Sequence, residues 1–195
     1  TMAFLYNFGV AIQTPKTEQN NSTEQYKVAL NMGIAITDAI SAVVNKNDKD
    51  FLKYAGYINE YAERLNVSEA VLNKYTLIKN AVSAGEWDKV ENLLYDMEEN
   101  VFAELKNNDM TQESILIMTA GWIEGLYVSS RSLQSNPNAN ASKALNKQNF
   151  VKYLQSNLDN LNDDLTNKAE MLAVFDALPK IEAVINQKNH VFTAE

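Results

Sequence analysis

Glu124 is the residue whose surroundings in the sequence most suggest chemistry. It lies in the run from Ile115 to Val128, which is apolar around its whole helical projection apart from one threonine and Glu124 itself. A carboxylate among apolar groups has to be paired, hydrogen-bonded or protonated, because burial of a bare charge is costly. Glu124 could therefore bind a ligand or accept and donate a proton. The structural alternative is that it pairs with Arg131, Arg64 or a tyrosine hydroxyl and fixes helix packing.

Asp38 is a second carboxylate in an apolar helical segment. Its face of the helix is small in the middle and polar at both ends, which favours a solvated or half-buried position. Asp38 would gain significance if it converged with Glu124, but sequence spacing does not determine whether the two meet. The residues that share its face are Lys27, Asn31, Ala35, Ala42 and Asn45.

A third candidate is an edge of aromatic residues on the segment that follows. Tyr54 and Tyr61 flank an apolar stripe, and Tyr57 and Arg64 lie one step further out. Tyrosine and arginine are enriched at binding surfaces, because they combine a large contact area with a polar tip. The edge could bind a protein partner or a small ligand. The alternative is an ordinary rim of the core, in which Glu60 and Arg64 form an i,i+4 pair.

Composition excludes most other chemistry. The chain has no Cys, and its one histidine is His190, so thiol catalysis, thiolate metal sites and the paired Glu-x-x-His motifs of di-iron bundles are absent. No phosphate-binding or dinucleotide motif occurs. The net charge of −8 argues against nucleic-acid binding, which needs a basic surface. We therefore expect no catalytic residues, no metal and no cofactor.

The elements that position these residues are predicted to be helices. Apolar residues recur at helical spacing through the chain, and Gly and Pro are scarce, at 6 and 3 residues. The last two stripes run from Val151 to Leu165 and from Ala169 to Gln187. The earlier helices are predicted at about 3–12, 23–45, 49–65, 68–85, 87–107 and 111–133.

The helix at about 111–133 is predicted to be the buried centre of the fold. A helix without a polar face is enclosed by its neighbours, and the apolar run from Ile115 to Val128 is shorter than the roughly 20 residues that span a bilayer. We therefore expect an all-α, antiparallel up-and-down bundle of seven or eight helices around this helix. The prediction is one domain over residues 1–195, with no transmembrane segment and with a flexible loop at about 134–147.

Two segments carry a resemblance to a known group of proteins. Gly33-Ile34-Ala35-Ile36-Thr37-Asp38-Ala39 and Gly121-Trp122-Ile123-Glu124-Gly125-Leu126-Tyr127 are similar to segments of an uncharacterised all-helical, secreted or lipoprotein-like family of Bacteroidetes-type bacteria. The resemblance implies a periplasmic or cell-envelope location, and it implies no activity. Composition alone leaves a cytoplasmic location open.

These observations lead to two expectations of function. The first is a non-enzymatic binding or scaffolding domain of the bacterial cell envelope, which would engage a protein partner or a small molecule near the edge from Tyr54 to Arg64. The second is a small-molecule sensor or a carboxylate-dependent enzyme, with a buried Glu124 in a cleft between helices. The sequence does not indicate the oligomeric state.

Overall fold

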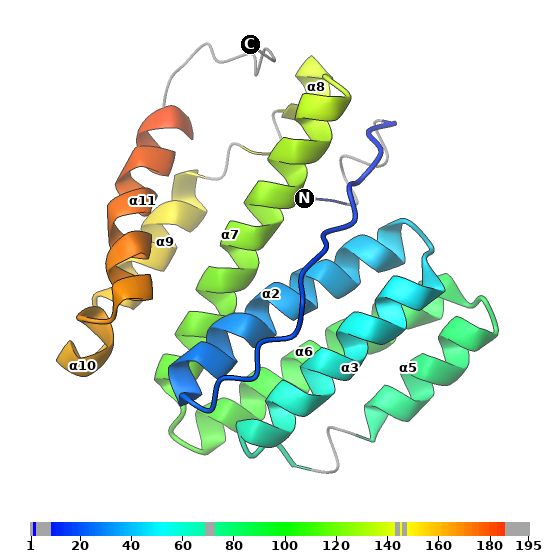
Figure 1. The fold of residues 1–195 in the computed structure, drawn as a ribbon, viewed down its shortest axis with the longest axis horizontal. Helices are drawn as coiled ribbons and strands as arrows, with labels where there is room; N and C mark the ends of the chain where they lie inside the picture. Colours follow the sequence, from blue (N-terminus) through cyan, green and yellow to red (C-terminus); the bar gives the residue numbers. More distant parts are fainter. Residues whose placement is uncertain (1, 3–8, 69–72, 143–144, 146–147, 186–195) are drawn as a thin grey trace.

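The computed structural model describes Met2, Leu145 and residues 9–68, 73–142 and 148–185 (Figure 1). Within these residues the fold is all-α and contains no strand, as the sequence predicts. The helices are α2 (Gln25–Val44), α3 (Asp48–Arg64), α5 (Lys74–Ser83), α6 (Trp87–Asn107), α7 (Thr111–Ser135), α8 (Ala139–Ser142), α9 (Gln148–Leu158), α10 (Asp163–Thr166) and α11 (Ala169–Ile185).

Helix α2 lies at the centre of the described structure, packed between α3 and α7 (Figure 1). Its small and apolar side chains let both neighbours approach, and Ala29, Met32, Ala39 and Ala42 are completely buried. By length and composition α2 could cross a membrane, because an 18-residue stretch of it has a mean hydropathy of 1.5. However, 67% of that stretch is buried inside the protein. Such burial is the pattern of a core helix in a folded domain.

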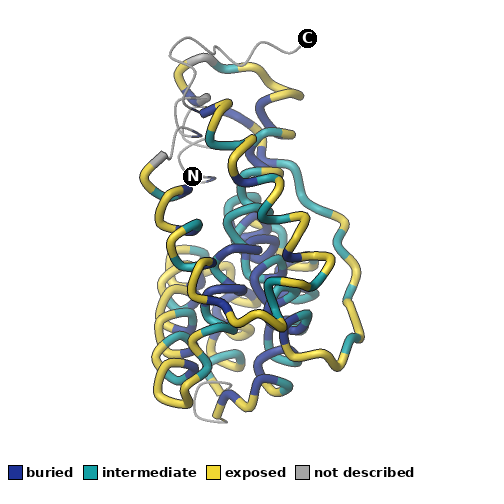
Figure 2. Tube along the Cα trace, turned by 90° about the vertical axis from the view of Figure 1, so that its left-hand side faces the viewer, coloured by how far each residue is buried: buried dark blue, intermediate teal, exposed yellow. Residues whose placement is uncertain are grey.

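The prediction that the helix at 111–133 is enclosed on every side is not confirmed. The observed α7 is buried along the face that meets α2, but Tyr127 on the opposite side is 57% exposed. Trp122 and Ile123 are half-buried. The physical reason is that α2, packed between α3 and α7, takes the enclosed position. Figure 2 shows the buried stretches along the inner helices and the exposed ones on the outside.

Helices α2 and α7 approach each other unusually closely at two glycines. A Cβ atom on Gly33 would lie 2.1 Å from the carbonyl oxygen of Ile117, and one on Gly121 would lie 3.1 Å from the carbonyl oxygen of Gly33. The Thr37 hydroxyl donates a hydrogen bond of 2.8 Å to the carbonyl oxygen of Gly121. The glycines that weaken each helix thus allow backbone contact between the two. This contact brings the segments 33–39 and 121–127 side by side.

Short connections place α3, α5 and α6 next to one another, with α3 also packed on α2. The side chain of Asn47 caps α3 by accepting a hydrogen bond from the amide of Asp50. Gly85 follows α5 with a φ of +71°, the left-handed conformation that glycine adopts at the end of a helix. α6 has the bounds predicted from the sequence.

Helices α9 and α11 pack against each other beside α7 (Figure 1). The stripe from Val151 to Leu165 is not one helix: α9 ends at Leu158, and α10 begins after a turn. Asn162 explains the break, because its side chain accepts a hydrogen bond from the amide of Leu165 and so caps a new helix. α11 continues unbroken through the exposed Pro179.

Two predicted segments differ from expectation in their described parts. Of the helix predicted at 3–12, residues 3–8 lie outside the described residues, and residues 10–12 have no regular secondary structure. The flexible loop predicted at 134–147 contains the short helix α8. Ala141 and Leu145 in this segment are buried in a small second core with Met2, Val10, Ile12, Val128 and Leu133.

Candidate functional site: a strap over a buried carboxyl group

An extended segment at the N-terminus crosses the face formed by α2 and α3 (Figure 1). We call residues 9–24 the strap. Between Pro15 and Asn20 its residues alternate strictly between half-buried and exposed, as expected for an extended chain with one side on a surface (Figure 2). Pro15, Thr17 and Gln19 occupy the inward positions.

The strap is held mainly through its own backbone. Side chains of α3, together with Asn45 just after α2, bond to main-chain atoms at five points along the strap, two or three residues apart. In chain order the bonds are Asn45 Nδ2 to Ile12 O (2.9 Å), Tyr54 Oη to Pro15 O (2.6 Å), Lys53 Nζ to Thr17 O (2.9 Å), Asn20 N to Tyr61 Oη (2.9 Å) and Arg64 Nη1 to Ser22 O (3.1 Å).

The predicted aromatic edge therefore lies beneath the strap. Tyr54 and Tyr61 are almost fully buried, at 1% and 2% exposure, and burial raises the pKa of both phenols. Tyr57 is half-buried and meets the Tyr54 ring edge-on, with 6.0 Å between the ring centres. Arg64 is half-buried and pairs with Glu60 across one helical turn. These residues line a face whose occupant in this structure is the protein's own chain.

Asp38 is completely buried, with 0% exposure, and is not on the solvated or half-buried face that its neighbours in sequence suggested. Neither of its carboxylate oxygens has a hydrogen-bond partner of regular geometry. The reason for the burial is tertiary. The strap covers this side of α2, as the bond from Asn45 to the strap and the influence of the Thr17 hydroxyl on Asp38 both indicate.

The environment of Asp38 strongly favours its protonated form. Its pKa is raised to about 7, chiefly because burial disfavours the charged carboxylate. The charge of Glu124 raises the pKa of Asp38 as well, whereas the Thr17 hydroxyl and the Lys53 ammonium lower it. Glu124, on α7, is thus near enough to act on Asp38, on α2, which sequence spacing could not determine.

Glu124 is half-buried on α7 and forms no hydrogen bond or ion pair with any residue of the described chain. Burial raises its pKa. Arg131 is exposed, and no ion pair connects it to Glu124. The structural pairing considered for Glu124 is therefore absent from the described residues.

The site also contains residues that the sequence analysis did not single out. Lys53 is the clearest: its ammonium bonds to the strap, pairs with Glu18 at 3.5 Å, and lies over the Tyr54 ring at 5.1 Å. Thr17 and Asn45 are the others. The available signal was Pro15 within a polar run, since proline favours an extended backbone, but nothing in the sequence indicated where that segment lies.

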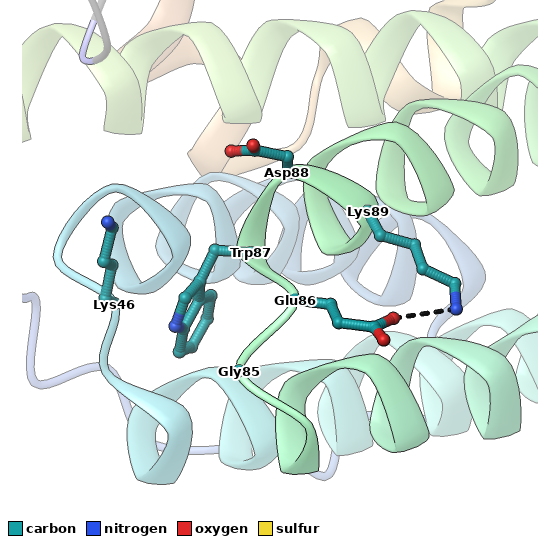
Figure 3. A pocket seen from close by; sticks show the side chains of 6 residues that line it. All are labelled: Lys46, Gly85, Glu86, Trp87, Asp88 and Lys89. Carbon is teal, nitrogen blue, oxygen red and sulfur yellow. Dashed lines mark hydrogen bonds and ion pairs between the residues drawn. The ribbon is translucent and has the colours of Figure 1, made fainter.

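A shallow pocket of about 420 Å³ lies elsewhere, between the corner that joins α2 to α3 and the corner that joins α5 to α6 (Figure 3). Figure 3 shows Lys46 and Trp87 on one side and the ion pair of Lys89 with Glu86 on the other. The pocket contains two lysines and two acidic residues, so its charge is balanced. It includes none of the residues predicted as site residues and indicates no particular ligand.

The fold and the site define an all-α protein in which an N-terminal strap covers the buried carboxyl group of Asp38, with the half-buried Glu124 near enough to act on it. Among the described residues no group of three or more His, Cys, Asp or Glu side chains is placed to hold a metal ion. No protein-family model, curated protein or solved structure significantly matches the chain. Function has to be inferred from the site itself.

Proposed function

We propose that the protein is a non-enzymatic helical binding domain that holds an extended polypeptide segment of a protein partner against the face formed by α2 and α3. The strap is then the intramolecular occupant of this face. The observation that carries the proposal is the series of five side-chain bonds to the strap backbone. Carbonyl and amide groups occur in every polypeptide, so a face that binds main-chain atoms can accept another extended segment in place of the strap.

The chemistry of the face supports binding more than catalysis. Its polar tips are donors and acceptors for a peptide backbone: Tyr54 and Lys53 bond to the strap, and the Lys53 ammonium lies over the rings of Tyr54 and Tyr57. Tyrosine side chains provide contact area with few rotatable bonds. We also propose that the helices form an antiparallel up-and-down bundle as a rigid support, and that the domain functions in the cell envelope. The resemblance of two segments and the Cys-free, Arg-poor composition support that location.

The test uses the full chain with its strap loosened. Val10 and Ile12 anchor one end of the strap in the second core, so the double variant Val10→Asp/Ile12→Asp should release that end and free the face. A fluorescent peptide with the sequence of residues 9–24 should bind this variant at least about tenfold more tightly than the wild type, because the intramolecular competitor is removed. Fluorescence anisotropy measures the binding.

Leu77→Asp is the matched control, since Leu77 is an exposed apolar residue on α5, 54% exposed, away from the strap. It adds a charge without loosening the strap and should leave peptide affinity at the wild-type level. Circular dichroism confirms that the double variant retains its helices. A folded double variant that binds the peptide no better than the wild type would refute the proposal.

The second candidate function is a small-molecule sensor or a carboxylate-dependent enzyme that uses Glu124. The observation that favours it is that the charge of Glu124 acts on the buried Asp38, while neither carboxyl group forms an ion pair or a hydrogen bond of regular geometry in the described structure. Native mass spectrometry of protein purified without denaturation tests this function. A non-covalent mass that disappears in the denatured spectrum supports it. A bare mass of 21.9 kDa supports the peptide-binding proposal.

A further inference from the structure

The carboxyl group of Asp38 is an unusual feature for the interior of a small protein. It is completely buried, and neither oxygen has a hydrogen-bond partner of regular geometry, the Thr17 hydroxyl being the one hydrogen-bonding group that acts on it. More than about 90% of buried polar groups in folded proteins have at least one partner, because an unmet buried acceptor is costly. Two unmet acceptor atoms on one side chain therefore indicate a position that is built to receive a donor.

The nearby charges leave this position without a counter-ion. Glu124, from α7, adds a second negative charge and has no partner of its own in the described structure. Lys53, from α3, is the cation whose charge acts on Asp38, but its ammonium bonds to the carbonyl oxygen of Thr17 and pairs with Glu18. Within the described chain no ion pair within 4.0 Å joins Lys53 to Asp38. The site thus has two carboxyl groups and no committed cation.

The strap places Thr17 over this position. Thr17 is half-buried on the inward side of the strap, while Lys16 and Glu18 on either side of it are exposed. The Thr17 hydroxyl acts on the Asp38 carboxyl, but a hydroxyl carries no charge and has one proton to donate. A lysine at this point of an extended segment would bring an ammonium group with three donors on a flexible stem.

We propose that Asp38 and Glu124 form a subsite for a basic side chain, and that the preferred occupant of the α2–α3 face is an extended segment with a lysine at the position of Thr17. This inference rests on the proposed binding function and adds the chemical character of the partner. A partner segment with that lysine displaces the strap, because the strap offers Asp38 only an uncharged hydroxyl and gives neither carboxyl group a cation.

The test is the full-length variant Thr17→Lys, studied by thermal denaturation at pH 8. Pairing of the ammonium with Asp38 should raise Tm by about 4 °C, as expected for one charge-assisted hydrogen bond in a protein of this size. Thr17→Gln controls for a long side chain without charge. Asn21→Lys controls for an added positive charge, since Asn21 is an exposed strap residue near the start of α2.

The decisive comparison is with the double variant Thr17→Lys/Asp38→Asn, which should lose most of the gain when compared with Asp38→Asn alone. A gain that persists undiminished without the Asp38 carboxylate would overturn the subsite, and so would a Tm for Thr17→Lys no higher than that of Asn21→Lys. The two proposals fail separately. If the strap peptide does not bind the loosened variant while Thr17→Lys is stabilised through Asp38, the binding function is wrong and the subsite stands.

Discussion

Replacement of Asp38 by asparagine tests the description of the buried carboxyl directly. The pKa of Asp38 is about 7 in the folded protein, against an ordinary value of 3.8. Between these two pH values the folded state holds a proton that the unfolded state has lost. The contribution of Asp38 to stability is therefore complete below about pH 4 and is lost progressively as the pH rises to about 7.

The magnitude follows from the size of this window. Each pKa unit corresponds to about 1.4 kcal/mol, so the linked change in the free energy of unfolding is about 4 kcal/mol. Asparagine stays neutral and does not undergo this loss. Relative to the wild type, Asp38→Asn should gain about 4 kcal/mol of stability between pH 4 and pH 8. The gain is measured as a difference, because an unmet asparagine amide adds a constant cost at every pH.

Urea denaturation followed by circular dichroism at several pH values provides the measurement, with an unchanged m-value showing that the two unfolding transitions are comparable. Asp96→Asn, at an exposed position on α6, is the matched control for the substitution itself. A stability difference between Asp38→Asn and the wild type that is constant from pH 4 to pH 8 would refute the reasoning. It would mean that Asp38 is ionised and paired in the folded protein.

Three further predictions concern the helix contact, the second carboxyl group and the strap. Gly33→Ala should destabilise the protein by about 3 kcal/mol, because the new Cβ would lie 2.1 Å from a backbone oxygen of α7. A Cβ atom on Gly56 would meet open space, so the control variant Gly56→Ala should stabilise the protein by about 0.5–1 kcal/mol. Equal Tm values for the two variants would contradict the close approach of α2 and α7. Glu124→Gln should keep or gain stability at pH 8 in urea denaturation, since it loses no ion pair, and a loss above about 1 kcal/mol would show that the carboxylate holds the helices together. Tyr54→Phe should speed tryptic cleavage at Lys16, because the strap loses a hydrogen bond of 2.6 Å; an unchanged cleavage rate would show that this bond does not secure the strap.

Helix boundaries were predicted well where a nearby residue or an apolar stripe marks them. Gly85 was expected to end a helix and does so with a positive φ, and α6 has the bounds its apolar stripe indicated. The stripe from Val151 to Leu165 wrongly predicted a single helix. Its periodicity continues across the turn between α9 and α10, where Asn162 caps α10. A single side-chain cap therefore overrode an apolar pattern of several turns.

The candidate site was predictable only in part. Asp38 and Glu124 were recognisable as carboxylates in apolar helices, but their meeting depends on the Gly33 and Gly121 contact, which requires knowledge of the helix pairing. The prediction that Asp38 lies on a solvated or half-buried face was wrong, because the sequence does not show which segment covers that face of the helix. Burial of a helix face depends on what covers it, and here the strap, which directly precedes α2 in the chain, folds back along the helix.

The sequence by itself determined the all-helical class, because apolar spacing along the chain specifies which local conformation can bury a continuous face. It also indicated which residue types could act and, through the absence of Cys and the single histidine, which chemistry could not occur. The tertiary structure alone decided that the strap lies across α2 and α3 and that Tyr54 and Tyr61 bind its backbone. The physical reason is that the strap is recognised largely through carbonyl and amide groups, which every residue carries and which therefore leave no pattern in the sequence.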